Sequence, residues 1–165
     1  MDLGLLLLRM VIGLTLAAHG VQKLFGWFGG HGLDGTGALL EQMGFVPGRL
    51  HALMAGFLET AAGLLLAAGL LTPLASALIL AVMVVAAMTA HSRGGFFLTS
   101  GGYEYNVVIA ATAISVAFTG AGAWSLDALL GLPSGGPLPG LAAIVVGAIG
   151  SAGSLLTRQH VEARS

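Results

Sequence analysis

The chain contains no cysteine among its 165 residues. A disulfide framework, a thiolate nucleophile and a persulfide relay are therefore excluded, because each of them needs a cysteine sulfur. Any redox chemistry must come from a bound cofactor or from a partner. Charge is also scarce, and the formal net charge is −1. Such a balance argues against nucleic acid as a partner.

The composition is that of an integral membrane protein. Soluble domains carry about 25% charged residues, whereas this chain has 8% charged and 56% hydrophobic residues with a mean hydropathy of +0.95. The N-terminus lacks the basic segment of a secretory signal, because leucines follow Met1 and Asp2 almost at once. We therefore expect the first apolar run to be a retained membrane span.

Five apolar runs separated by glycine- and proline-rich turns predict an all-α integral membrane helical bundle, with four core transmembrane helices and a fifth at the C-terminus. The predicted spans are residues 3–28, 50–71, 74–91, 103–119 and 138–156. Residues 1–130 would form the four-helix bundle, residues 131–157 a Gly/Pro linker with the additional helix, and residues 158–165 a polar tail. Thr72 and Pro73 make a tight turn between the second and third spans, which predicts an antiparallel hairpin.

Residues 26–37 are rich in glycine but match no nucleotide-binding motif. Their glycines neither follow a strand nor end in Gly-Lys-Ser/Thr, so both the P-loop and the dinucleotide fingerprint fail. We predict a turn there. A short helix would follow, capped by Thr36 and presenting Leu39, Leu40 and Met43 along the membrane surface.

Glu59 lies near the middle of the second span, with no other acidic or basic side chain around it. An ionisable group in hydrocarbon costs several kcal/mol unless it is paired, so it is a functional-site candidate. Gly56 and Gly63 share its helix face and would let a neighbouring helix approach the carboxyl. The alternative is a protonated Glu59 that donates a structural hydrogen bond between helices.

Further polar side chains gather at one end of the predicted bundle. Alternating spans bring His19, Lys23, His91 and Glu104 to this end, with Glu59 two to three turns inside it. We predict one intramembrane polar pocket there, with Lys23 opposite Glu59 or Glu104. Arg9 lies nearer the other face of the bundle. Tyr103 and Asn106, three residues apart, are expected to face one neighbour.

Such a pocket suits three kinds of occupant: a small acidic or quinone-like ligand, a proton relay, or a metal held by His19, His91 and a carboxylate such as Glu59. The metal is the least specific of these, because helical metal sites usually carry Glu-x-x-His or His-x-x-x-His and neither occurs here.

Basic residues also predict the orientation. One side of the bundle receives Lys23, Arg49, Arg93, Arg158 and Arg164, whereas the other has Arg9 alone, inside a helix. The positive-inside rule then places the N-terminus outside and the C-terminus in the cytoplasm.

The ordered motifs of residues 3–130 resemble the DoxX family of small bacterial membrane proteins. The matching features are Leu8-Arg9 with Gly13, His19-Gly20, Lys23-Leu24-Phe25-Gly26, Gly35-Thr36, Gly44-Phe45 with Pro47, Glu59 with Gly63, Gly69-Leu70-Leu71-Thr72-Pro73, Met83, His91 and Gly102-Tyr103-Glu104-Tyr105-Asn106. The resemblance implies a four-helix bundle in the bacterial inner (plasma) membrane, and the C-terminal run exceeds that unit. It also implies a polar core at the positions of Arg9, His19, Lys23, Glu59, His91 and Glu104.

What the resemblance implies about activity is thiosulfate:quinone oxidoreduction, and membrane complexes with sulfurtransferase and superoxide dismutase partners. Three functions follow in order of preference: an oxidoreductase subunit that docks a quinone, a scaffold that recruits soluble redox or sulfur enzymes, and a small-solute or proton carrier. A second membrane subunit and a homo-oligomer both stay open as partners within the bilayer.

Overall fold

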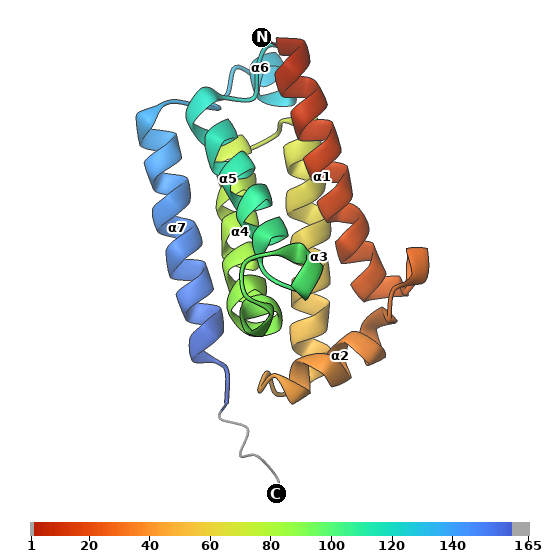
Figure 1. Ribbon diagram of the computed structural model, residues 1–165. Helices are drawn as coiled ribbons and strands as arrows, with labels where there is room; N and C mark the ends of the chain where they lie inside the picture. Colours follow the sequence, from red (N-terminus) through yellow and green to blue (C-terminus); the bar gives the residue numbers. More distant parts are fainter. Residues whose placement is uncertain (1, 160–165) are drawn as a thin grey trace, which may run out of the picture.

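The computed structural model describes residues 2–159, and every regular element in that range is helical. This confirms the predicted all-α bundle. Five longer helices run side by side (Figure 1). They are α1 (Asp2–Phe25), α3 (Gly48–Ala68), α4 (Thr72–Ala86), α5 (Glu104–Thr119) and α7 (Pro137–Leu156).

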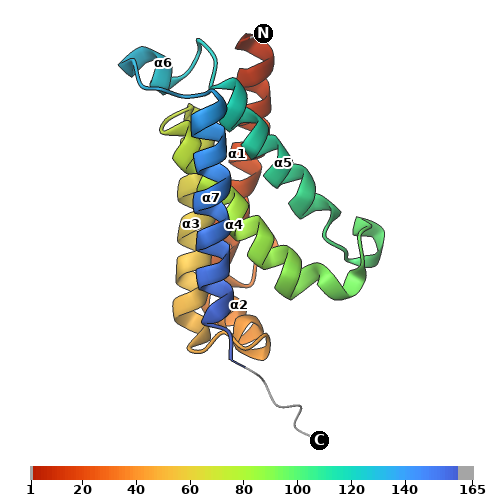
Figure 2. The same ribbon diagram turned by 90° about the vertical axis from the view of Figure 1, so that its left-hand side faces the viewer.

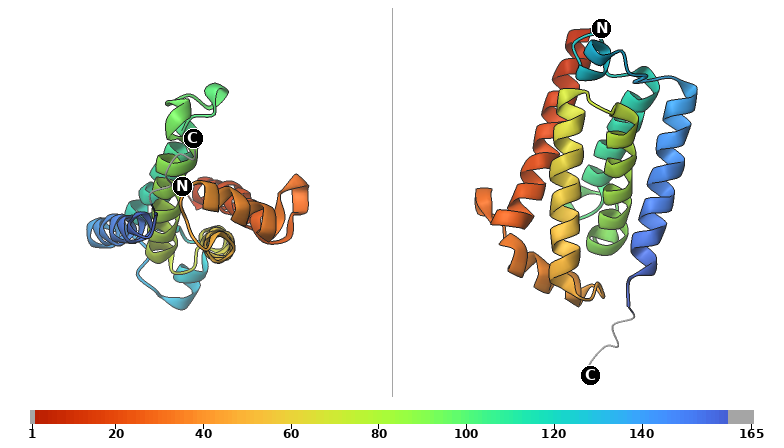
Figure 3. Two further views of the ribbon diagram at one scale, coloured as in Figure 1. Left: turned by 90° about the horizontal axis from the view of Figure 1, so that it is seen from below. Right: turned by 180° about the vertical axis from the view of Figure 1, so that it is seen from behind.

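Short elements close the two ends of the bundle. Helix α2 (Gly32–Gln42) lies across one end, and α6 (Leu126–Leu130) lies at the other, beside the start of α1 (Figures 1 and 3). Single turns complete the connections: η1 (Trp27–Gly29), η2 (Ala87–His91), η3 (Ser92–Gly94) and η4 (Leu98–Ser100). Because α7 finishes at the α2 end, Asp2 and Leu156 lie at opposite ends of the bundle (Figure 1).

Four described helical segments are long and apolar enough to cross a membrane: Asp2–Phe25, Gly48–Ala68, Thr72–Gly94 and Pro137–Leu156. Long apolar side chains on their outer faces, such as Val11, Val145 and Ile149, are exposed and would meet lipid. The C-terminal run therefore has the length of a span. Helix α5 is the short one, since its 16 residues extend only about 24 Å against about 30 Å of hydrocarbon.

Glycines bring α1 and α3 into close contact. A Cβ at Gly13 would lie 2.7 Å from the backbone nitrogen of Ala67, and one at Gly20 would lie 2.5 Å from the backbone of Gly56. Gly63 in turn faces the backbone of α1 at Gly13 and Ala17. Small residues at such contacts let helix backbones pack where lipid supplies no hydrophobic driving force. The expected close approach of a neighbour to the Glu59 face is thus present, and the neighbour is α1.

The hairpin between α3 and α4 lies where the sequence predicts it, at Thr72 and Pro73. Gly69 ends α3 in the left-handed region, at φ 63°, and Pro73 lies in the first turn of α4. At its other end α4 continues as a π-helical turn, η2, and then as η3. Toward that end, α4 and α5 lean away from α3 and α7, and the loop with η3 and η4 stands apart (Figure 2).

The predicted start of the short helix is wrong. Helix α2 begins at Gly32, so Thr36 lies inside the helix and does not cap it. Of the predicted turn, residues 26–37, only residues 26–31 precede the helix. Packing explains the difference. A Cβ at Gly37 would lie 3.0 Å from the backbone nitrogen of Arg49. Close packing of a glycine-rich helix on α3 therefore overrides the low helical propensity of glycine.

Candidate functional site

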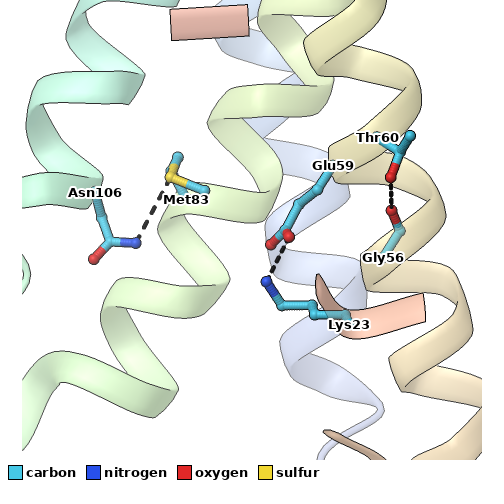
Figure 4. A network of polar contacts seen from close by, with 6 residues as sticks. All are labelled: Lys23, Gly56, Glu59, Thr60, Met83 and Asn106. Carbon is cyan, nitrogen blue, oxygen red and sulfur yellow. Dashed lines mark hydrogen bonds and ion pairs between the residues drawn. The ribbon is translucent and has the colours of Figure 1, made fainter. Parts of the chain in front are cut away.

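The partner of Glu59 is Lys23. Its Nζ lies 2.5 Å from Oε2 of Glu59, joining the last turn of α1 to the middle of α3 (Figure 4). The Glu59 side chain is 5% exposed and that of Lys23 30%. The charge of Lys23 offsets part of the cost of burying the carboxylate. Of the two partners that the sequence left open for Lys23, the structure selects Glu59.

A cavity of about 520 Å³ opens beside this pair, at the α2 end of the bundle. Its walls come from the end of α1, from α2 and α3, from α4 with η2, and from the end of α7. The lining is largely apolar, with Leu40, Leu58 and Val85 among it, and Lys23 and Glu59 contribute charge. The cavity is therefore an apolar chamber with an ion pair in its wall.

His91 lines the same cavity, so side chains from α1, α3 and η2 meet there. Nδ1 of His91 lies 3.1 Å from the carbonyl oxygen of Gly101, which orients the ring. Three of the predicted pocket residues, Lys23, Glu59 and His91, thus share one cavity. A ligand-binding role for them stays a prediction.

His19 lies one turn from Lys23 on α1 but is not among the residues that line this cavity. Its ring meets the ring of Tyr105 edge-on, with centroids 5.7 Å apart. The Tyr105 hydroxyl is buried and has no hydrogen-bond partner within residues 2–159. Tyr105 was not singled out from the sequence, although its place between Glu104 and Asn106 at the start of a span was a usable signal.

Three other predicted polar residues, Glu104, Tyr103 and Asn106, lie at the start of α5 and contact the preceding loop or α4. The Glu104 carboxylate accepts a hydrogen bond of 3.0 Å from the backbone N–H of Leu98. Tyr103 packs edge-on against Phe96, with centroids 5.7 Å apart. Asn106 donates to Sδ of Met83 at 3.6 Å (Figure 4).

The expectation that Tyr103 and Asn106 face one neighbour is therefore wrong. Tyr103 precedes the first helical residue and has φ −91° and ψ 11°, so helical spacing does not apply to it. Glu104 is likewise absent from the lining of the cavity. Its position in the first turn of α5 points the carboxylate to the adjacent loop, where it accepts a backbone hydrogen bond.

Arg9 belongs to a separate polar cluster at the opposite end. It is fully buried, and its Nη2 donates to the carbonyl of Trp124 at 2.6 Å. Buried Asp127 on α6 accepts from the backbone N–H groups of Leu71 and Thr72 at 2.7 and 2.9 Å. Asp127 thus satisfies free N–H groups at the start of α4. Sequence reasoning assigned Asp127 no role, although it is the one charged side chain in residues 120–139 and this isolation was a signal.

Within residues 2–159, no group of three or more His, Asp or Glu side chains is placed to hold a metal ion. His19, His91 and Glu59 therefore find no support as a joint metal site. Residues that sequence reasoning did not assign to the pocket also line the cavity. They are His51 of α3 and Gly150, Gly153, Ser154 and Thr157 at the end of α7.

The C-terminal helix is consequently a wall of the site. Gly147 brings α7 onto α4, since a Cβ there would lie 2.9 Å from the Ala77 carbonyl oxygen. Two turns on, Ser154 and Thr157 reach the cavity. Apolar periodicity alone does not reveal which helix α7 packs against, because lipid-facing and helix-facing positions are equally apolar.

Comparison with known proteins identifies the family. No match was found among curated proteins or solved structures. A family model described as DoxX matches residues 4–92, which is more than half of the 165-residue chain and includes Lys23, Glu59 and His91. The match ends before α5, whereas the motifs noted above continue to Asn106. Together, the matched segment and the apolar helices establish that this chain is a membrane protein of the DoxX family.

Proposed function

We propose that this protein is the membrane subunit of an oxidoreductase system and binds a lipid-soluble quinone in the cavity beside Lys23 and Glu59. One observation carries the proposal: a partly buried ion pair lies in the wall of an apolar cavity of about 520 Å³ between membrane-spanning helices. Charged groups inside a membrane protein usually mark a ligand or ion site. The volume also falls within the usual range for small-molecule sites.

The lining suits the chemistry of a quinone headgroup. Its two carbonyl oxygens need hydrogen-bond donors, and the donors available in the cavity wall include the Lys23 ammonium and the imidazole of His51. Apolar side chains such as Leu58 and Val82 would contact the faces of the ring. The isoprenoid tail would leave through the open side of the cavity toward lipid.

Electrons must reach the quinone from elsewhere, because the chain has no cysteine and no other redox-active side chain in the cavity. Reduction to quinol consumes two electrons and two protons. A partner enzyme that oxidises two thiosulfate anions to tetrathionate releases the two electrons required. Protons would come from water by way of cavity groups such as Glu59 and His91. In this proposal the present chain positions the acceptor and its partner supplies the reductant.

The test is purification in mild detergent, followed by mass spectrometry of bound quinone. The wild type should retain quinone, whereas Glu59→Gln and Lys23→Met should retain at least tenfold less. Asp34→Asn is the matched control, because Asp34 forms an exposed ion pair with Arg49 outside the cavity. Quinone-free wild-type protein that also fails to support thiosulfate-dependent quinone reduction with added partners would overturn the proposal. A pH-dependent flux in liposomes that Glu59→Gln abolishes would favour a carrier.

Recruitment of soluble enzymes is a second candidate, favoured by two loops at the α2 end. Trp27 and Phe28 of η1, and Phe97 with Leu98 near η4, are exposed. Both loops stand clear of the helices (Figures 1 and 2). Substitution of Phe97 and Leu98 by serine can be compared with Lys23→Met. Loss of co-purifying proteins in the first variant and their retention in the second would favour enzyme recruitment over quinone binding.

A further inference from the structure

A second pocket, of about 470 Å³, adjoins the cavity at the α2 end of the bundle. Leu39, Met43, Thr89 and Ala90 line both spaces, so the two are neighbours with a common wall. The second pocket differs in chemistry, because it also presents Arg93, Arg158, Gln42 and Ser92. We call it the basic pocket.

Contacts between distant segments build the basic pocket. Nε of Arg158 donates to the carbonyl of Met43 at 2.6 Å, and the backbone N–H of Gln159 donates to the Gly44 carbonyl at 2.8 Å. These bonds tie the end of α7 to the turn after α2. Gly44 has φ 93°, a conformation that favours glycine. The guanidinium of Arg158 is thereby held at the pocket and opposite the end of α4, where Arg93 follows η2.

Among the described residues, the two arginines differ from the other basic side chains at this end in having no carboxylate partner. Lys23 pairs with Glu59, and Arg49 pairs with Asp34 at 3.0 Å. For Arg93 and Arg158, no carboxylate within residues 2–159 lies at ion-pair distance, and no acidic residue lines the basic pocket. In the part of the chain that the structure describes, two positive charges therefore face one pocket without a counter-ion.

We propose that the basic pocket binds the phosphate of an anionic phospholipid. Guanidinium groups bind phosphate through paired charge-assisted hydrogen bonds, and arginine is suited to this role. Leu39, Met43 and Met88 of the same lining provide apolar contact for the first carbons of the acyl chains. The distribution of Lys and Arg predicts this end to be cytoplasmic, where anionic lipids concentrate and basic pockets between helices bind their headgroups.

This inference does not rest on quinone binding. The phosphate would lie at Arg93 and Arg158, outside the wall that carries Lys23 and Glu59, so the two sites have separate determinants. Lys23→Met should weaken quinone retention and leave the lipid in place. Arg93→Gln with Arg158→Gln should weaken lipid binding and leave quinone retention unchanged.

The experiment is native mass spectrometry of delipidated protein titrated with phosphatidylglycerol or phosphatidylcholine. Wild type should bind phosphatidylglycerol at least tenfold more tightly than phosphatidylcholine. The double variant should lose that preference, because the two arginines supply the attraction to the anionic headgroup. Arg49→Gln is the matched control, since Arg49 lies at the same end in an exposed pair. If the double variant misfolds, Arg93→Gln alone can be measured, because Arg93 lies in an exposed turn. It should lose part of the preference for phosphatidylglycerol.

Three results would overturn the proposal. Equal binding of the two lipids by wild type would show that no headgroup charge is recognised. An unchanged preference for phosphatidylglycerol in both the double and the single variant would mean that Arg93 and Arg158 do not recognise the headgroup. Inorganic phosphate separates the sources of the anion: displacement of the lipid by low-millimolar phosphate would assign the pocket to a free oxyanion, whereas retention of the lipid supports a phospholipid.

Discussion

Nζ of Lys23 and Oε2 of Glu59 lie 2.5 Å apart, across the close contact between α1 and α3 and in the wall of the larger cavity. The pair therefore does two things. It compensates a carboxylate that is almost fully buried, and it gives an apolar cavity a charged wall that a ligand would meet. Structural and functional roles separate when each partner is replaced alone and then both together.

Replacing one partner should destabilise the protein more than replacing both. Lys23→Met leaves the almost fully buried Glu59 carboxylate without compensation and should cost about 3–5 kcal/mol. Glu59→Met should cost less, because the Lys23 side chain is 30% exposed. The double change should cost much less than the sum of the two single changes. Thermal unfolding in detergent measures this. Arg49→Met at the exposed pair should change stability by about 1 kcal/mol or less. Additive losses would mean that the pair is not coupled.

Alanine at Gly13 should destabilise the contact between α1 and α3. A Cβ there would meet the backbone of Gly63 and Ala67, which cannot move aside as a flexible side chain would. Overpacking of this kind costs about 1–3 kcal/mol. Gly4→Ala is the control in the same helix, because a Cβ at Gly4 has nothing within 4 Å. The comparison needs only the melting temperatures of the two variants, and equal values would argue against the close approach.

Asp127→Ala should be strongly destabilising although the residue lies in a short connecting helix. The change removes the acceptor for the backbone N–H groups of Leu71 and Thr72. Each buried donor left unsatisfied costs about 1–3 kcal/mol, and two lose their acceptor here. Denaturation midpoints should show little change for Asp34→Ala, whose side chain is 88% exposed. A small loss of stability for Asp127→Ala would mean that these two hydrogen bonds contribute little to the contact between α6 and the start of α4.

The crossing of α7 can be tested with single cysteines in this cysteine-free chain. Gln159 bonds to Gly44 at the α2 end, Thr99 belongs to η4 in the loop at that end, and Leu129 belongs to α6 at the opposite end (Figures 1 and 2). All three are exposed. Membrane-impermeant thiol reagents should therefore label Thr99→Cys and Gln159→Cys from one side, predicted to be the cytoplasm, and Leu129→Cys from the opposite side. Labelling of Gln159→Cys together with Leu129→Cys would mean that α7 does not cross.

The sequence alone determined the class of protein and the approximate helices. Long apolar runs ended by glycine and proline leave a membrane-spanning chain no regular structure other than helices, because its backbone must satisfy its own hydrogen bonds in lipid. A carboxylate isolated in such a run must also find a partner, which made Glu59 stand out. Local patterns were less informative at residues 26–37, where packing of Gly37 on α3 outweighs helical propensity.

Only the tertiary structure decided which polar groups meet. Lys23 reaches Glu59 because Gly20 and Gly56 let α1 and α3 pack closely, while Glu104 is directed into its own loop. The tertiary structure also made Asp127 a cap for α4 and the end of α7 a wall of the cavity. These contacts join residues far apart in the chain, and in a membrane protein apolar periodicity does not distinguish a face that meets lipid from one that meets another helix.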